Sequence, residues 1–148
     1  MKLFTGVSET LLIPLAGRAG AEKWHPQFRD PKAREILTTL EADTRGFEKD
    51  ISSMYACALR AHFIDETIKE LLKEYPHALL LNLGAGLCTR FFRIDNGLFR
   101  CIDLDLPQVI EVKKQLFSEQ ERYRLIAKSI LDFSWIDEIG IQPKDKVI

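Results

Sequence analysis

The sequence is poor in cysteine, balanced in charge and free of long hydrophobic runs. Its three cysteines are odd in number and no two have metal-site spacing, so neither a disulfide framework nor a bound metal is expected. Lysine and arginine number 21 against 22 acidic residues, which argues against a dedicated nucleic-acid-binding protein and against a polybasic membrane-surface protein. Cysteines without a disulfide framework fit a reducing compartment, so the expected location is cytoplasmic.

The N-terminal region contains a short apolar stretch, residues 11–16, that resembles a weak signal peptide after Lys2. Glu9 stands just before this stretch and Arg18 follows it, which disfavours secretion. No run approaches the ~20 apolar residues that a transmembrane helix needs. What the chain does contain is 46% hydrophobic residues in a length of 148, enough for a buried core and too many for a disordered chain.

Three helices are predicted in the first half of the chain. Ser8 is a good N-cap for the apolar residues that follow at helical spacing, although Pro14 requires this helix to start later or to kink. Asp30, which is followed by proline, is the expected N-cap of a second helix. The clearest periodicity, over residues 59–75, predicts an amphipathic helix that Pro76 ends.

The second half of the chain alternates between strands and helices. The apolar run of residues 78–81 leads into Asn82 and Gly84, which is typical of a strand buried on both faces of a parallel sheet. The later elements expected are strands over residues 99–104 and 123–127, helices from Pro107 and over residues 134–139, and the start of a fourth strand over residues 146–148.

This order of elements predicts an α/β fold, a Rossmann-like doubly wound parallel sheet preceded by helices. We divide the chain into an N-terminal helical cap region, residues 1–75, and the first part of a Rossmann-like domain, residues 76–148. Because the chain ends inside an expected strand, we expect this domain to be incomplete and truncated at its C-terminus.

The motif that carries chemistry is the turn Gly84-Ala85-Gly86 between the first strand and a helix. Glycine lets the backbone turn sharply and come close to a ligand, and the N–H groups at the start of the following helix can bind it. Asp103 and Asp105 follow Gly84 by 19 and 21 residues, the separation at which a carboxylate binds a ribose diol in Rossmann-type sites. The pattern therefore predicts a nucleoside-containing ligand.

A dinucleotide is not the favoured ligand. The full G-x-G-x-x-G motif is absent because Thr89 stands where the third glycine would fall. The P-loop pattern is also missing, which disfavours ATP or GTP hydrolysis. A ligand without pyrophosphate, such as S-adenosylmethionine, fits better, and an NAD-dependent oxidoreductase remains the alternative.

Five ordered segments resemble the leucine carboxyl methyltransferase-like family, especially its bacterial branch of polyketide-synthesis O-methyltransferases. The segments are VSETLLIPLAGRA (7–19), FRDPKAREI (28–36), NLGAGLCTRFFRIDNG (82–97), DLDLPQVIEVKKQL (103–116) and LIAKSILDFSWID (125–137). The resemblance implies a class I methyltransferase fold and S-adenosyl-L-methionine as cofactor.

The resemblance also implies roles for individual residues. The turn Gly84-Ala85-Gly86 matches the one beside the methionine part of the cofactor, and Asp105 matches the acid that holds the ribose hydroxyls, with Asp103 the less favoured candidate.

Residues outside the glycine turn match the family as well. Asp132 matches the acid near the adenine amino group, with Phe133 beside the ring. Arg60 matches the arginine that pairs with the cofactor carboxylate, a task suited to its bidentate guanidinium. Cys88 departs from the pattern, since family members often have aspartate there.

Each role has a simpler alternative. The glycine turn alone could merely link a strand to a helix. Asp105 could be only the N-cap of the helix that starts at Pro107, and Asp132 only a cap for the turn near Ser134. Arg60 could be a solvated surface charge.

Other polar residues are interpreted as structural. Cys88 is taken as a small packing residue, and Arg90 and Arg93 as the solvent-facing side of a helix. The three histidines form no ligand cluster in the sequence and are expected in loops or on the surface: His25, His62 and His77.

The function predicted from these observations is methyl transfer from S-adenosylmethionine to an oxygen. The acceptor is expected to be a small molecule, with a protein carboxyl terminus as second choice, and no nucleic-acid or membrane partner is expected. No catalytic residue is assigned. The alternative is a catalytically inert cofactor-binding or interaction fragment of such an enzyme.

Overall fold

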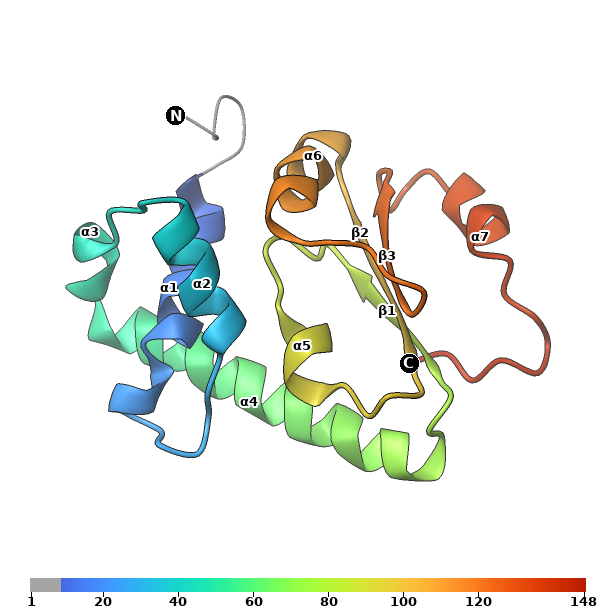
Figure 1. The fold of residues 1–148 in the computed structure, drawn as a ribbon, viewed down its shortest axis with the longest axis horizontal. Helices are drawn as coiled ribbons and strands as arrows, with labels where there is room; N and C mark the ends of the chain where they lie inside the picture. Colours follow the sequence, from blue (N-terminus) through green and yellow to red (C-terminus); the bar gives the residue numbers. More distant parts are fainter. Residues whose placement is uncertain (1–8) are drawn as a thin grey trace. The chain divides into compact units, whose positions relative to one another are not determined.

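The computed structural model describes residues 9–148, which form two compact units along one chain (Figure 1). The first unit comprises the described residues up to Thr67 together with Leu87–Ile94, and the second comprises Ile68–Gly86 and Asp95–Ile148. No helix among the described residues is long and apolar enough to cross a membrane. The domain division predicted at residues 75 and 76 stays a prediction.

The first unit is helical. Its elements are the 3-10 helices η1 (Glu9–Leu11) and η2 (Ala21–Lys23), the helices α1 (Leu12–Ala19), α2 (Pro31–Thr39), α3 (Arg45–Glu48) and α5 (Arg90–Ile94), and the N-terminal part of α4 (Ile51–Glu74). Pro14 is the third residue of α1, in the first turn, where its missing N–H breaks no intrahelical hydrogen bond. The predicted later start is therefore confirmed, whereas the predicted N-cap Ser8 lies outside the described residues.

Side-chain caps explain two helix starts. Asp30 caps α2 as predicted, because its carboxylate accepts a hydrogen bond from the backbone N–H of Ala33 over 2.9 Å. Helix α4 begins at Ile51, earlier than the predicted residue 59, and the carboxylate of Asp50 accepts the backbone N–H of Ser53 at its start. The first stretch of α4 was not predicted because Ile51 and other exposed apolar residues interrupt the amphipathic pattern.

The second unit is built on a parallel sheet. Strands β1 (Leu79–Leu83), β2 (Arg100–Asp105) and β3 (Tyr123–Ala127) pair in the order β1-β2-β3. Beyond the other edge of β1, Val147 forms a parallel bridge with Leu79, in agreement with the predicted fourth strand. The chain thus moves outward from β1 to β3 and then returns to the far side of β1, which confirms the α/β, Rossmann-like prediction.

Helices cover both faces of this sheet (Figure 1). Trp135 and Ile139 of α7 (Ser134–Ile139) pack in one cluster with Leu79, Ile102 and other apolar residues of the strands. Side chains of β2 point alternately to the two faces of the sheet, so Asp103, next to Ile102, lies on the opposite face. That face is covered by α6 (Pro107–Leu116), as the contact between Asp103 and Lys113 shows. A sheet covered on both faces needs apolar strands, which is why residues 78–81 read as one hydrophobic run.

Candidate cofactor-binding site

The glycine turn follows β1, at the point where the order of the strands reverses. In open α/β sheets this reversal leaves a crevice at the carboxyl ends of the strands, where ligands bind. Gly84 and Gly86 have φ angles of 67° and 50°, a left-handed conformation that favours glycine. A Cβ added at Gly84 would meet no described atom within 4 Å, so the turn presents bare backbone to open space.

Asp105, the last residue of β2, holds the turn. One carboxylate oxygen accepts the backbone N–H of Gly86 over 2.7 Å, and the other accepts the N–H of Leu106, also over 2.7 Å. The N-cap of α6 is Leu106, which makes no side-chain cap, so Asp105 is not the N-cap of that helix. A carboxylate has about four acceptor positions, so the half-buried Asp105 retains capacity for two hydroxyl donors.

Asp103 is engaged with the protein instead. Its side chain is buried, accepts hydrogen bonds from Asn82 and Tyr123 over 2.8 and 2.6 Å, and pairs with Lys113 over 2.6 Å. These contacts use the oxygens that a ligand would need. The structure therefore distinguishes the two aspartates that the spacing alone left open, and leaves Asp105 as the one with free acceptor capacity.

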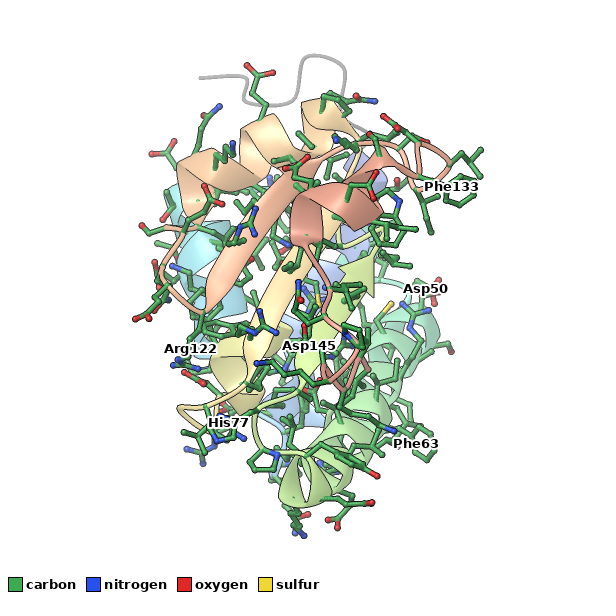
Figure 2. The ribbon with its side chains drawn as sticks, turned by 90° about the vertical axis from the view of Figure 1, so that its right-hand side faces the viewer. Asp50, Phe63, His77, Arg122, Phe133 and Asp145 are labelled. Atoms are coloured by element: carbon green, nitrogen blue, oxygen red, sulfur yellow. The ribbon has the colours of Figure 1, made fainter. Side chains whose placement is uncertain are left out.

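Asp132 and Phe133 lie between β3 and α7. One oxygen of Asp132 accepts the hydroxyl and backbone N–H of Ser134 over 2.7 and 3.1 Å, and these bonds lower the pKa of Asp132. Asp132 thus bonds to the first residue of α7, although the N-cap of that helix is Phe133, and its other oxygen accepts no hydrogen bond from a described residue. Phe133 is 68% exposed and points away from the ribbon (Figure 2).

Arg60 lies on the part of α4 that belongs to the first unit. Its side chain is exposed and has no hydrogen-bond or ion-pair partner among the described residues. The structure thus brings the glycine turn and Asp105 into direct contact, and it places Asp132 and Phe133 after the strand next to β2. Arg60 stays a prediction.

A family model described as leucine carboxyl methyltransferase matches residues 7–127. The chain belongs to the leucine carboxyl methyltransferase family. Among curated relatives, it is 34% identical over 137 residues to the tetracenomycin polyketide synthesis O-methyltransferase TcmP of Streptomyces glaucescens. The match covers 91% of the chain and 51% of TcmP, so the chain spans about half the length of that relative.

One expectation for this family member was wrong: Arg90 and Arg93 do not face solvent. Arg93 pairs with Asp65 over 2.6 Å and with Asp30 over 2.7 Å, and its side chain is only 5% exposed. Arg90 pairs with Asp65 over 3.0 Å. Arg18 joins the group by pairing with Asp30 over 3.1 Å. The arginine side of the short helix α5 can be buried because two buried carboxylates compensate the guanidinium charges.

A sequence signal for this cluster exists at Asp65. It lies on a stripe of α4 whose other members are buried, at alternating spacings of four and three residues: Met54, Ala58, Ala61, Ile68 and Leu72. An acid inside an apolar stripe must find a cationic partner, because an unpaired buried carboxylate is costly. The partners, Arg90 and Arg93, follow 25 and 28 residues later, so periodicity alone does not identify them.

Proposed function

We propose that this chain provides the cofactor-binding part of an S-adenosylmethionine-dependent O-methyltransferase. The observation that carries the proposal is the hydrogen bond between Asp105 and the Gly86 N–H. It joins the acid at the end of β2, where Rossmann-type sites bind a ribose, to an open glycine turn at the point where the strand order reverses. Membership of the leucine carboxyl methyltransferase family and the likeness to an O-methyltransferase support the same conclusion.

The residues present fit this cofactor. The bare backbone at Gly84 gives room for close approach of the methionine part, and Asp105 has acceptor capacity for two ribose hydroxyls. The unengaged oxygen of Asp132 suits the adenine amino group. The exposed ring of Phe133 offers an apolar face to the adenine ring of the cofactor. The guanidinium of Arg60 has the chemistry to pair with the carboxylate of the cofactor's methionine part.

S-adenosylmethionine, when bound, would supply an activated methyl group for transfer to an acceptor oxygen, with S-adenosylhomocysteine as the leaving group. The residues of this chain bind and orient, a contribution that reaches about 7–11 kcal/mol of the barrier in the best cases. A carboxylate acceptor needs no base, whereas a hydroxyl must lose its proton. We propose a small-molecule oxygen as acceptor and a cytoplasmic location, and we assign no catalytic base.

Cofactor binding is tested by calorimetric titration of S-adenosylhomocysteine into the chain. Asp105→Asn should weaken binding by about tenfold or more, because hydrogen bonds to a charged acceptor contribute about 1.5–3 kcal/mol. Asp137→Asn is the matched control, since Asp137 is an exposed acid of α7 outside the candidate site. Absence of binding by the folded chain, or equal weakening by both substitutions, would contradict the proposal.

Two further titrations separate the alternatives. NAD should not bind, and saturable NAD binding would favour the oxidoreductase. Transfer of an isotopically labelled methyl group to a panel of phenols and carboxylic acids, read by mass spectrometry, tests turnover and the acceptor class. Binding of S-adenosylhomocysteine without any labelled product would favour the inert cofactor-binding alternative.

A further inference from the structure

Lys113 is a charged residue in an unusual place. It belongs to α6 and its side chain is 0% exposed, on a face shared with the buried apolar residues Val109, Ile110 and Val112. Its ammonium donates a hydrogen bond to the backbone carbonyl of Gly86 over 2.9 Å and pairs with Asp103 over 2.6 Å. Lys113 therefore connects α6 to the glycine turn.

The peptide groups on both sides of Gly86 are thus held from outside the turn. The N–H bonds to Asp105 at the end of β2, and the carbonyl bonds to Lys113 of α6. Earlier in the turn, the N–H groups of Gly84 and Ala85 both donate to the carbonyl of Leu104 over 2.9 and 3.1 Å. Glycine is conformationally permissive, so the left-handed Gly84 and Gly86 do not fix the turn by themselves. Its shape is set by these four hydrogen bonds.

Stability alone gives little reason for a buried lysine here. Burying an ion pair costs about as much desolvation energy as its attraction returns, and an apolar side chain of similar volume is commonly as good or better. The charge of Lys113 is compensated by Asp103, which is buried and accepts further hydrogen bonds from Asn82, Tyr123 and the thiol of Cys101. The contact that an apolar residue could not reproduce is the hydrogen bond to Gly86.

We infer that Lys113 is a positioning residue of the cofactor site. Its hydrogen bond to the carbonyl of Gly86 holds the glycine turn in the conformation that binds the cofactor, and Asp103 orients its ammonium group. The inference rests on the proposed function, since it assigns the turn to the cofactor. Lys113 acts through the backbone and does not itself touch the ligand. Its contribution is pre-organisation, which raises affinity by removing the entropy cost of ordering the turn on binding.

The experiment separates positioning from stability with a double variant. Lys113→Met alone leaves Asp103 buried without a counter-ion and is expected to be strongly destabilising. Lys113→Met combined with Asp103→Asn removes both charges, keeps an unbranched side chain in the helix and keeps an acceptor for Tyr123. This double variant should melt close to the unsubstituted chain yet bind S-adenosylhomocysteine roughly tenfold or more weakly. Lys114→Met, an exposed neighbour on the same helix, is the control and should leave affinity unchanged.

A second readout needs no cofactor. Amide hydrogen exchange, followed by nuclear magnetic resonance, should show the Gly86 N–H exchanging at least about tenfold faster in the double variant, with the Gly84 N–H as an internal reference bonded to Leu104. If the unsubstituted chain binds no S-adenosylhomocysteine, the proposed function fails, and this measurement still decides the role of Lys113. Unaltered exchange at Gly86, or unaltered affinity in a folded double variant, would overturn the inference.

Discussion

The carboxylate of Asp105 accepts the backbone N–H of Gly86 over 2.7 Å, although 19 residues separate them along the chain. Parallel pairing of β1 with β2 brings them together, because Leu83 lies beside Leu104 in the register: Asp105 directly follows Leu104, and Gly86 comes three residues after Leu83. One side chain therefore belongs both to the architecture of the turn and to the candidate ribose site. Substitution of Asp105 should affect the chain even when no ligand is bound.

Asp105→Asn is expected to lower the free energy of unfolding by about 1–2 kcal/mol without ligand. Both carboxylate oxygens accept backbone N–H groups, and an amide can supply only one acceptor for the two. Urea denaturation followed by circular dichroism measures the change. Asp137→Asn serves as the control and should stay within about 0.5 kcal/mol. Equal midpoints for the two variants would show that Asp105 does not hold the turn.

Gly84→Ala tests the backbone conformation of the turn. The site has open space for a methyl group, so the cost is that of a left-handed alanine, about 1–2 kcal/mol of unfolding free energy. Gly46→Ala in α3 is the matched control: a Cβ there also meets no described atom within 4 Å, but the φ of Gly46 is not positive, and alanine should be neutral or stabilising there. A neutral Gly84→Ala would mean that the turn is not held left-handed in solution.

Asp30→Ala should be strongly destabilising, by about 3–5 kcal/mol. The substitution removes the cap of α2, leaves Arg18 without its buried carboxylate and takes away one of the two buried carboxylates that pair with Arg93. Asp43→Ala removes an aspartate whose pair with Arg45 is exposed, and should cost far less. Thermal melts of both variants compare the two environments. Similar losses in both would contradict the burial of the charges in the first unit.

Gly17→Ala probes the contact of α1 with α4. A Cβ at Gly17 would lie 2.9 Å from the Cβ of Cys57 and 2.9 Å from the carbonyl oxygen of Met54, so the helices would have to separate. The expected cost is about 1–3 kcal/mol, typical of an overpacked core. Gly20→Ala, whose Cβ would meet its nearest atom at 3.5 Å, is the control and should cost far less. A well-tolerated Gly17→Ala would show that the two helices are less closely packed.

The sequence predicted what depends on local pattern. The strand before Gly84 and the acid at the end of the next strand were predictable, because parallel βαβ units fix the separation between them. The choice between Asp103 and Asp105 was made by resemblance alone, and the structure supplies its physical reason: Asp103 compensates Lys113. Sequence periodicity places Lys113 among apolar residues but does not identify the carbonyl it bonds.

Contacts between distant segments were not predictable in the same way. The interpretation of Arg90 and Arg93 as solvent-facing failed because their partners, Asp65 and Asp30, lie on other helices. The early start of α4 was missed because Asp50 caps a stretch without amphipathic pattern. In each case a polar side chain satisfies a partner that hydrophobic periodicity does not report.

The ion pair between Asp95 and Arg122 gives the chain a pH-dependent contribution to stability. Two parallel hydrogen bonds join the groups, from Nη1 over 2.6 Å and from Nη2 over 2.8 Å, and Figure 2 shows Arg122 at the surface of the second unit. The Arg122 hydrogen bonds, aided by the Gly97 N–H, lower the pKa of Asp95 in the folded chain. Because the folded pKa lies below the unfolded value of about 3.9, the contribution is present above that value and is lost as pH falls through the folded pKa.

Asp95→Asn should therefore lower the free energy of unfolding by about 0.5–1 kcal/mol at pH 7, the range for a partly exposed bidentate pair. The difference between the chain and its variant should stay constant down to about pH 5 and shrink below about pH 4, as the carboxyl group takes up a proton in the unsubstituted chain. Urea denaturation at a series of pH values measures this difference directly. Arg100 and Asp145 are joined by a single, longer hydrogen bond of 3.1 Å, and Asp145→Asn should show a smaller difference at pH 7. A difference for Asp95→Asn that persists unchanged at low pH would mean that the neutral side chain, and not its charge, stabilises the fold.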